Sequence, residues 1–286
     1  MSEVRMLRRI ADELSRASGE GLGPDEPSAL WAAVAGMKPA EVWLKRESEP
    51  AADVVKRFWK AVEDRKQGVP FAYAVARAGF RTLELAVDPR ALIPRPETEG
   101  LVELVLRETG NGKRGLAADI GTGSGCIALS LAVEGDFERV VATERSPAAA
   151  ALARENVERI APKTPVEIRE GNLLGPLVDK GERGIYRVIV SNPPYLTERE
   201  FTELDASVRE FEPREALISG STGLDATRAL YAGAGMLLER GGLLALEIDE
   251  RRADAVRALG QGYGWDVAIH NDVFGYPRYA LSIKED

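Results

Sequence analysis

The sequence of 286 residues is poor in the side chains that hold metals or form disulfides. It contains one cysteine, Cys126, and one histidine, His270. A single cysteine excludes an intramolecular disulfide, and the two residues together provide no cluster for a zinc site. Cys126 falls at the start of an expected helix and His270 at the end of an expected strand, so we interpret both as structural. Chemistry by a protein-bound metal is therefore not expected.

Long hydrophobic runs are also missing. No apolar stretch approaches the roughly 20 residues that a membrane-spanning helix needs. The start Met1-Ser2-Glu3-Val4-Arg5 lacks the apolar segment of a secretory signal. Because 44% of the residues are hydrophobic, the chain can still bury a substantial core. We expect a globular protein of the cytoplasm with no membrane partner.

Positive charge is in short supply. The chain has 38 lysines and arginines against 46 aspartates and glutamates, a formal net charge of −8. Residues 1–75 carry 12 basic and 12 acidic side chains, so the acidic excess lies in the remainder. Proteins that bind a phosphate backbone depend on clustered lysine and arginine. Direct binding to nucleic acid is therefore not expected.

Apolar residues recur at helical spacing near the start of the chain. They are Val4, Leu7, Ile10, Ala11 and Leu14, and later Val54, Val55, Phe58, Trp59 and Val62. We expect residues 1–78 to form a helical bundle, and its neutral charge leaves a protein-docking role open. Within residues 79–115, the alternation from Phe80 to Val87 predicts a connecting hairpin, and Pro96 predicts the first turn of a helix.

A glycine-rich loop begins the main domain, residues 116–286. Leu116 to Ile120 predicts a strand, and the sequence Gly121-Thr122-Gly123-Ser124-Gly125 leads from it into a helix. The next expected strand, Arg139 to Thr143, ends at Glu144, which follows Gly121 by 23 positions. This matches the spacing of about 20 at which an acidic side chain binds the hydroxyls of a ribose. The loop alone also fits a nicotinamide oxidoreductase, or a glycine turn without a ligand.

The most informative stretch runs from Val188 to Tyr195. Its β-branched residues predict a buried strand, which ends at Asn192 because Pro193 and Pro194 have no N–H for the sheet. The exit offers carbonyl acceptors and the Asn192 side-chain oxygen. Such acceptors suit a planar NH2 group, whose nitrogen lone pair they would turn toward an electrophile. Tyr195 would add a flat face.

The position of this stretch favours a binding site over an ordinary rigid turn. Open α/β sheets bind ligands beyond the carboxyl ends of their strands, and the glycine loop lies upstream at a similar strand end. Hydride transfer has no need for a pocket without donors, whereas methyl transfer to nitrogen does. The sequence therefore favours methyl transfer.

The remaining segments complete the expected sheet. Residues 196–221 are polar and too long for a simple connection, which predicts a partly ordered flap over the substrate. Leu224 to Arg240 predicts a helix capped by Gly241-Gly242, before a strand from Leu243 to Ile248. The last two expected strands, Trp265–His270 and Tyr279–Ile283, are too close for a crossover helix and should be antiparallel, closing a seven-stranded sheet.

Four motifs together resemble the protein-(glutamine) methyltransferases that modify peptide chain release factors. They are Leu92 to Glu99 (LIPRPETE), Asp119 to Gly125 (DIGTGSG), Val190 to Tyr195 (VSNPPY) and Leu246-Glu247-Ile248. The resemblance implies an α/β fold of the class I methyltransferase type with seven strands and an N-terminal helical bundle that docks the substrate. It also implies methylation of the glutamine in a Gly-Gly-Gln motif on its side-chain amide nitrogen. The methyl donor would be S-adenosylmethionine, leaving S-adenosylhomocysteine.

The resemblance also implies roles for individual residues. Gly121, Thr122, Gly123, Ser124 and Gly125 would wrap the methionine part of the cofactor, Glu144 would hold its ribose in place of the usual Asp, and Asn172 and Leu173 would border its adenine. Asn192 would contact the cofactor as well as the substrate. Asn192, Pro193 and Tyr195 would be the catalytic residues, and Pro194 would join them in binding the substrate amide.

Other functions fit parts of this pattern. A related enzyme methylates a glutamine of ribosomal protein L3, and an adenine amino-methyltransferase acting on DNA or RNA would present a similar exocyclic amine. A protein that binds the cofactor without catalysis is a third interpretation, which the intact Asn192–Tyr195 motif disfavours. We expect an enzyme that acts as a monomer on a release factor.

Overall fold

The computed structural model describes residues 9–110 and 114–284, and the chain divides into two compact units. The first contains the residues up to Arg77 together with Asp205–Phe211. The second contains Ala78–Leu204 and the residues from Glu212 onwards. Each unit has its own hydrophobic core. No helix in the described part of the chain is long and apolar enough to cross a membrane.

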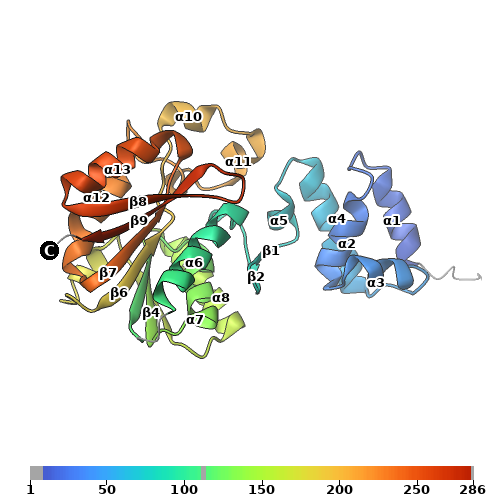
Figure 1. The fold of residues 1–286 in the computed structure, drawn as a ribbon. Helices are drawn as coiled ribbons and strands as arrows, with labels where there is room; N and C mark the ends of the chain where they lie inside the picture. The colour runs from blue at the N-terminus through green and yellow to red at the C-terminus, as the bar shows by residue number, and fades with distance from the viewer. Residues whose placement is uncertain (1–8, 111–113, 285–286) are drawn as a thin grey trace, which may run out of the picture. The chain divides into compact units, whose positions relative to one another are not determined.

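The first unit is built from short helices (Figure 1). They are α1 (Ile10–Ser18), α2 (Glu26–Ala35), α3 (Pro39–Leu44), α4 (Ala52–Lys66), α5 (Phe71–Ala74) and α11 (Ala206–Phe211). Trp31 and Phe58 are buried and meet edge to face, with ring centroids 4.9 Å apart. Such a pair adds about 0.5–1.5 kcal/mol beyond the burial of its surface. The helical spacing that predicted Phe58 and Val62 as core residues is confirmed.

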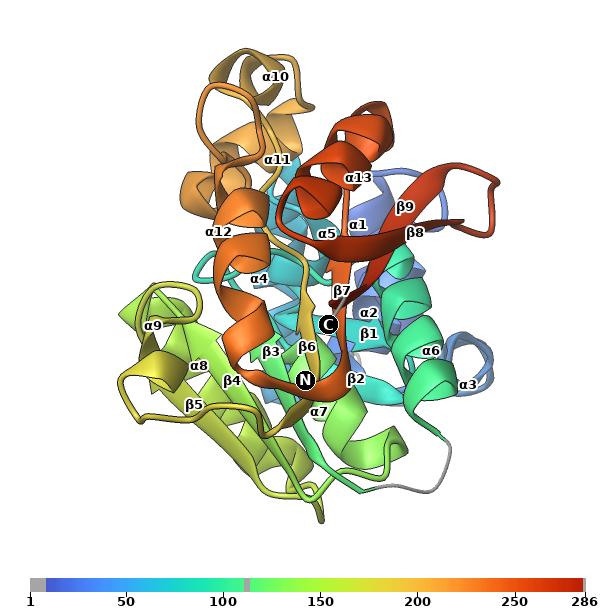
Figure 2. The same cartoon turned by 60° about the vertical axis from the view of Figure 1, so that its left-hand side comes forward.

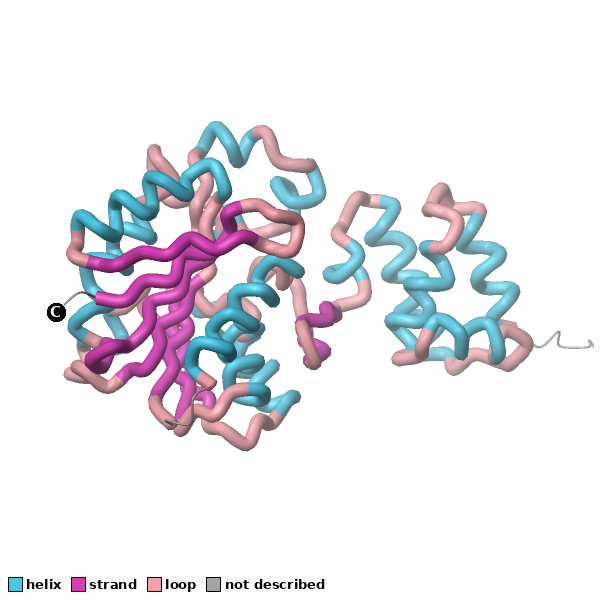
Figure 3. The backbone as a smooth tube through the Cα atoms, in the orientation of Figure 1, coloured by secondary structure: helices cyan, strands magenta, loops and turns pink. Residues whose placement is uncertain are grey.

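The second unit contains the seven-stranded sheet, seen as adjacent magenta strands in Figure 3. Its strand order is β5 (Val166–Glu170), β4 (Arg139–Glu144), β3 (Leu116–Ile120), β6 (Tyr186–Ser191), β7 (Leu238–Glu247), β9 (Pro277–Lys284) and β8 (Trp265–Asn271). Strand β9 is antiparallel to both of its neighbours, and the other pairings are parallel. The predicted sheet with an antiparallel final pair is confirmed.

Helices cover both faces of this sheet (Figures 1 and 2). They are α6 (Pro96–Thr109), α7 (Cys126–Glu134), α8 (Pro147–Ile160), α9 (Gly175–Val178), α12 (Asp225–Gly233) and α13 (Ala253–Gly262). On one face, alternate residues of β3 such as Ala118 and Ile120 pack in one core with Leu230 of α12 and Val256 of α13. The hairpin β1 (Arg77–Phe80) and β2 (Leu83–Ala86) precedes the sheet, close to its expected position.

The segment after β6 is ordered, which corrects the expectation of a partly ordered flap. It contains α10 (Glu198–Thr202), α11 and the 3-10 turn η1 (Arg214–Ala216). Leu196 donates its N–H to the Leu217 carbonyl, and Ser219 donates to the Leu196 carbonyl. These bonds join the beginning of the segment to its end. Its polar composition is therefore compatible with an ordered structure.

The helix expected from Leu224 to Arg240 is also wrong in extent. Helix α12 ends at Gly233, a 3-10 turn η2 (Ala234–Met236) follows, and β7 starts at Leu238. Gly241 and Gly242 therefore lie inside a strand and cap no helix. The pairing of β7 with β6 jumps from Leu238 to Leu243, and a Cβ on Gly242 would lie 3.0 Å from the Tyr186 carbonyl oxygen. The glycine pair lets the chain bulge where the backbones come close.

Candidate active site

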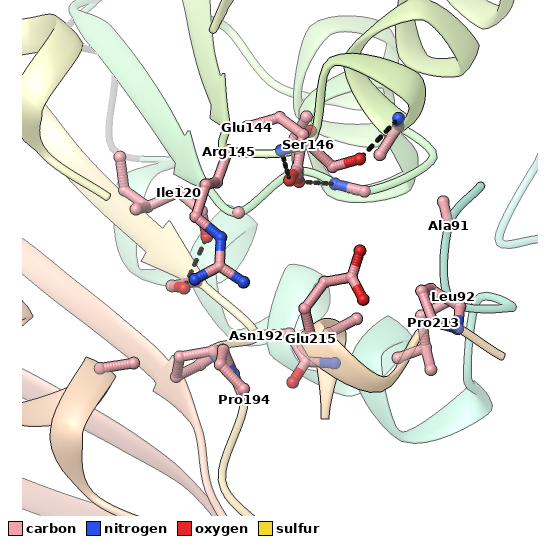
Figure 4. Close-up of a pocket in the computed structure, with 18 of the residues that line it drawn as sticks. Ala91, Leu92, Ile120, Glu144, Arg145, Ser146, Asn192, Pro194, Pro213 and Glu215 are labelled. Carbon is pink, nitrogen blue, oxygen red and sulfur yellow. Dashed lines mark hydrogen bonds between the residues drawn. The ribbon is translucent and has the colours of Figure 1, made fainter. Parts of the chain in front are cut away.

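A cavity of about 460 Å³ lies at the carboxyl ends of β3, β4 and β6. Its size is within the range of about 300–1,000 Å³ typical of small-molecule sites. Glu144 and Ser146 lie on one side of it, and Asn192 and Pro194 lie on the opposite side (Figure 4). The side chain of Glu215 extends between them. The cavity thus lies at the carboxyl ends of the strands, where we expected a ligand to bind.

Most residues that the sequence singled out line this one cavity. They are Gly121, Thr122, Gly123, Ser124, Glu144, Asn172, Leu173, Asn192, Pro193 and Pro194. Gly125 and Tyr195 are not among the lining residues. The cavity therefore brings the glycine loop and the Asn-Pro-Pro turn together, although they are about 70 positions apart in the sequence.

The glycine loop leaves room in the cavity because of its backbone. Gly121 has φ +75°, and a Cβ built on it would meet no atom within 4 Å, so the space beside it is open. Gly125 has φ +86° and precedes the first residue of α7. Its contribution is therefore the left-handed turn into the helix, a conformation that glycine adopts at no steric cost.

Asp119, the last residue but one of β3, holds the loop from beneath. Its Oδ2 accepts hydrogen bonds from Thr122 Oγ1 at 2.5 Å and from the Ala128 N–H at 3.0 Å. Burial raises the pKa of this carboxyl to about 7, against the lowering effect of those two bonds. Its Oδ1 and the Ser124 hydroxyl are buried without a hydrogen-bond partner in the described structure. Of these two residues only Ser124 lines the cavity, so its hydroxyl is the one that could bond a ligand there.

Glu144 is held by the backbone on both sides. Its Oε2 accepts from the Gly123 N–H at 3.0 Å, and its Oε1 accepts from the Ser146 N–H at 2.8 Å. Ser146 also caps α8, since its hydroxyl accepts from the Ala149 N–H. Each carboxylate oxygen keeps a further lone pair. The carboxylate is thus fixed in place and able to accept two hydroxyl groups.

Ser191, the residue before Asn192, links the Asn192 turn to the strand that leads into the glycine loop. Ser191 donates its hydroxyl to the Ile120 carbonyl at 2.6 Å, which links the ends of β6 and β3. Asn192 donates its side-chain Nδ2 to Thr98 Oγ1 at 3.1 Å. In the described structure, no donor is bonded to Asn192 Oδ1 or to the carbonyl of Pro193. Both residues line the cavity, and their two oxygens are free to accept a hydrogen bond; that they bind a substrate amide stays a prediction.

Several residues at the site were missed by reasoning from sequence. Buried Glu212 accepts from Arg95 Nη2 at 2.5 Å and from the Ile93 N–H at 3.1 Å, which holds the Leu92–Arg95 loop in the cavity wall. Tyr279 of β9 donates its hydroxyl to the Glu97 carbonyl at 2.7 Å and so fixes the first turn of α6. Glu212 lay in the segment expected to be a flap, where no periodic pattern marked it as buried.

Tyr195 lies beside the loop that follows η1, outside the cavity wall. Burial, with the nearby charge of Glu247, raises the pKa of its hydroxyl. Its carbonyl oxygen faces Gly223, which has φ +74°. A Cβ at Gly223 would lie 2.3 Å from that oxygen and 2.6 Å from Arg252 Nε. The proposed contact of Tyr195 with substrate stays a prediction.

We expect Gly223→Ala to lower the free energy of unfolding by about 2 kcal/mol or more, because a left-handed residue with a Cβ is strained and also clashes. Thermal unfolding followed by circular dichroism measures this as a fall in Tm. Gly262→Ala is the matched control, since its Cβ would meet nothing within 4 Å at the end of α13. Equal Tm values for the two variants would contradict this account of Gly223.

The cavity fits S-adenosylmethionine. The open space at Gly121, the unpartnered Ser124 hydroxyl and the fixed Glu144 carboxylate would receive its amino-acid part and its ribose diol. Leu173 would border the adenine, and Thr143 Oγ1 donates a hydrogen bond to the Leu173 carbonyl oxygen at 2.8 Å. No group of three or more metal-binding side chains occurs among residues 9–110 and 114–284.

Comparison with known proteins gives consistent matches. A family model of the methyltransferase small domain matches residues 98–211, and a model of the PrmC N-terminal domain matches residues 5–75. A release factor glutamine methyltransferase of Moorella thermoacetica is 43% identical over 222 residues, which are 77% of this chain and 76% of the relative. A protein of the same name from Deinococcus radiodurans is 36% identical over 246 residues, 86% of each chain.

A solved structure shows the same fold. The methyltransferase from Pyrococcus furiosus superimposes with a TM-score of 0.53 at 23% identity, covering 77% of this chain and 97% of that one. The fold, the cavity at the strand ends and the sequence relatives agree. The chain therefore belongs to the family of release factor glutamine methyltransferases.

Proposed function

We propose that this protein methylates the side-chain amide nitrogen of the glutamine in the Gly-Gly-Gln motif of a peptide chain release factor, with S-adenosylmethionine as the methyl donor. The observation that carries the proposal is that the glycine loop and Asn192 line one cavity, in which Asn192 lies opposite Glu144 (Figure 4). The names of the relatives, release factor glutamine methyltransferase, support the substrate.

The site would hold the cofactor with its glycine loop and Glu144. The loop Gly121–Ser124 leaves space for the methionine part, and the Glu144 carboxylate accepts the ribose hydroxyls. Asn172 and Leu173 border the adenine. When bound, S-adenosylmethionine supplies an electrophilic methyl group. The protein residues then have one remaining task, to align the amide nitrogen with it.

Asn192 and Pro193 perform this alignment in our proposal. An amide nitrogen is a weak nucleophile because its lone pair is delocalised into the carbonyl. Asn192 Oδ1 and the Pro193 carbonyl oxygen accept its two N–H bonds and hold the lone pair toward the methyl group. The same acceptors stabilise the positive charge that develops on the nitrogen. No strong base is required before the methyl group moves.

The helical unit would dock the release factor, and the enzyme would act as a monomer in the cytoplasm. The balanced charge of residues 1–75 suits a protein partner better than a nucleic acid. Binding of the release factor to this unit would raise the effective concentration of its glutamine at the site.

The test is mass spectrometry of a release factor after incubation with enzyme and S-adenosylmethionine. We expect one added methyl group, located on the glutamine of the Gly-Gly-Gln peptide, and none on a release factor whose glutamine is replaced by glutamate. Transfer of labelled methyl to ribosomal protein L3 or to nucleic acid, with none to the release factor, would replace this proposal by the corresponding alternative.

A further inference from the structure

A buried carboxylate outside the cavity wall is connected to the proposed catalytic amide. Glu247, at the end of β7, is 2% exposed and does not line the cavity. It accepts a hydrogen bond from Thr98 Oγ1 at 2.6 Å. Thr98 is also 2% exposed, and it lies in the first turn of α6, which Tyr279 holds from β9. The contact thus joins two rigid elements behind the site.

The contact determines how the Thr98 hydroxyl can be used. A hydroxyl has one proton and two lone pairs. Because Thr98 gives its proton to Glu247 Oε2, its oxygen can only accept from its other neighbour. That neighbour is Asn192, whose Nδ2 donates to Thr98 Oγ1 at 3.1 Å. Asn192 Oδ1 is then the end of the amide left for the cavity.

The orientation of this amide decides whether the pocket fits its substrate. The two ends of an asparagine side chain have nearly the same shape but opposite hydrogen-bonding character. With Oδ1 toward the cavity, Asn192 accepts from a substrate NH2. With Nδ2 there, two donors would face each other in a confined site, which is unfavourable.

We propose that Glu247 and Thr98 are positioning residues that set the amide orientation of Asn192, so that its oxygen faces the nitrogen to be methylated. The inference rests on the proposed function and concerns how that function depends on Glu247, which does not line the cavity, acting through Thr98, which does. When Glu247 is ionised, it accepts the hydrogen bond from Thr98, and Thr98 in turn accepts one from Asn192. Once protonated, it becomes a donor to Thr98, whose hydroxyl then donates to Asn192 and reverses the amide.

The surroundings of Glu247 put this change near neutral pH. Burial raises the pKa of Glu247 to about 7, while its bond from Thr98 opposes the shift. Other charged and titratable groups surround Glu247. They are Arg95, just before α6, Glu97 in α6, Arg278 and Tyr279 in β9, Tyr195 after β6, and Cys126 in α7. The productive ionised form is present above the pKa. We therefore expect kcat to rise with pH through about 7.

Thr98→Val removes the link without changing the size of the side chain. We expect kcat to fall about tenfold, the effect of one lost hydrogen bond, while the Kd of S-adenosylmethionine is unchanged. Thr98→Ser keeps the hydroxyl and should restore kcat. The Tm of each variant separates this effect from loss of folding. Wild-type kcat in Thr98→Val would overturn the proposal.

Glu247→Gln tests the ionisation separately, because the glutamine oxygen can still accept from Thr98 but cannot titrate. The readout is the side-chain NH2 resonance of Asn192 in nuclear magnetic resonance spectra from about pH 6 to about pH 8, a measurement that needs no turnover. We expect this resonance to titrate in the wild type and in the control Glu203→Gln, an exposed position after α10, but not in Glu247→Gln. Identical titration in all three would overturn the proposal. Absence of release-factor methylation by the wild type would instead count against the proposed function alone.

Discussion

Asn192→Ala is expected to reduce methyl transfer by about 100-fold or more, the cost typical of losing one aligned polar contact at a reacting centre. The substitution removes the oxygen proposed to hold the substrate NH2. Because the glycine loop and Glu144 are untouched, the Kd of S-adenosylmethionine should stay within a small factor of the wild-type value. Single-turnover kinetics with saturating release factor measures the rate, and calorimetric titration measures cofactor binding.

The matched control for this variant is Asn271→Ala. Asn271 carries the same side chain but is exposed at the end of β8 and does not line the cavity. We expect its rate to equal that of the wild type. If Asn192→Ala lost cofactor affinity and rate in equal measure, Asn192 would be a cofactor ligand and its role toward the substrate would be refuted.

Glu144→Gln is expected to weaken cofactor binding by up to about 100-fold. Two hydroxyl groups bonded to an ionised carboxylate contribute about 1.5 kcal/mol each or more, and a neutral amide with one oxygen recovers only part of this. The retained oxygen can still accept from the Gly123 or Ser146 N–H, so the loop should stay folded. Saturation with S-adenosylmethionine should restore kcat almost fully.

Glu170→Gln provides the comparison for Glu144. Glu170 ends the neighbouring strand β5, is exposed, and pairs with Arg154 away from the cavity. Its substitution should leave the KM for S-adenosylmethionine unchanged. A Glu144→Gln enzyme with normal KM and reduced kcat would assign the carboxylate to a step other than cofactor binding.

Local sequence patterns were sufficient for those parts of the site whose position depends on a single strand and the turn after it. The β-branched run before Asn192 and the two prolines after it defined where β6 stops, because proline cannot continue a sheet. The glycines from Gly121 onward and the acidic residue at Glu144 were recognisable for similar reasons, since each role depends on a local turn or spacing.

Contacts between distant segments could not be read in this way. Glu247 is separated from Thr98 by 149 positions, and nothing in either neighbourhood marks one as the partner of the other. Glu212 reaches Arg95 across 117 positions. The end of α12 was missed for a different reason. Its apolar pattern runs into β7 without a break, and only the pairing with β6 reveals that the chain is already in the sheet at Leu238.

The place of β9 in the sheet has a consequence for biosynthesis. This strand lies between β7 and β8, although it follows both in the chain, and its Tyr279 fixes the first turn of α6. A nascent polypeptide that has emerged only as far as β8 already contains the glycine loop and the Asn192 turn. It still lacks the strand that joins β8 to β7 and whose Tyr279 bonds the Glu97 carbonyl next to Thr98. We therefore predict that the amide-binding geometry proposed for Asn192 is acquired late in synthesis, after residues 277–284 have left the ribosome.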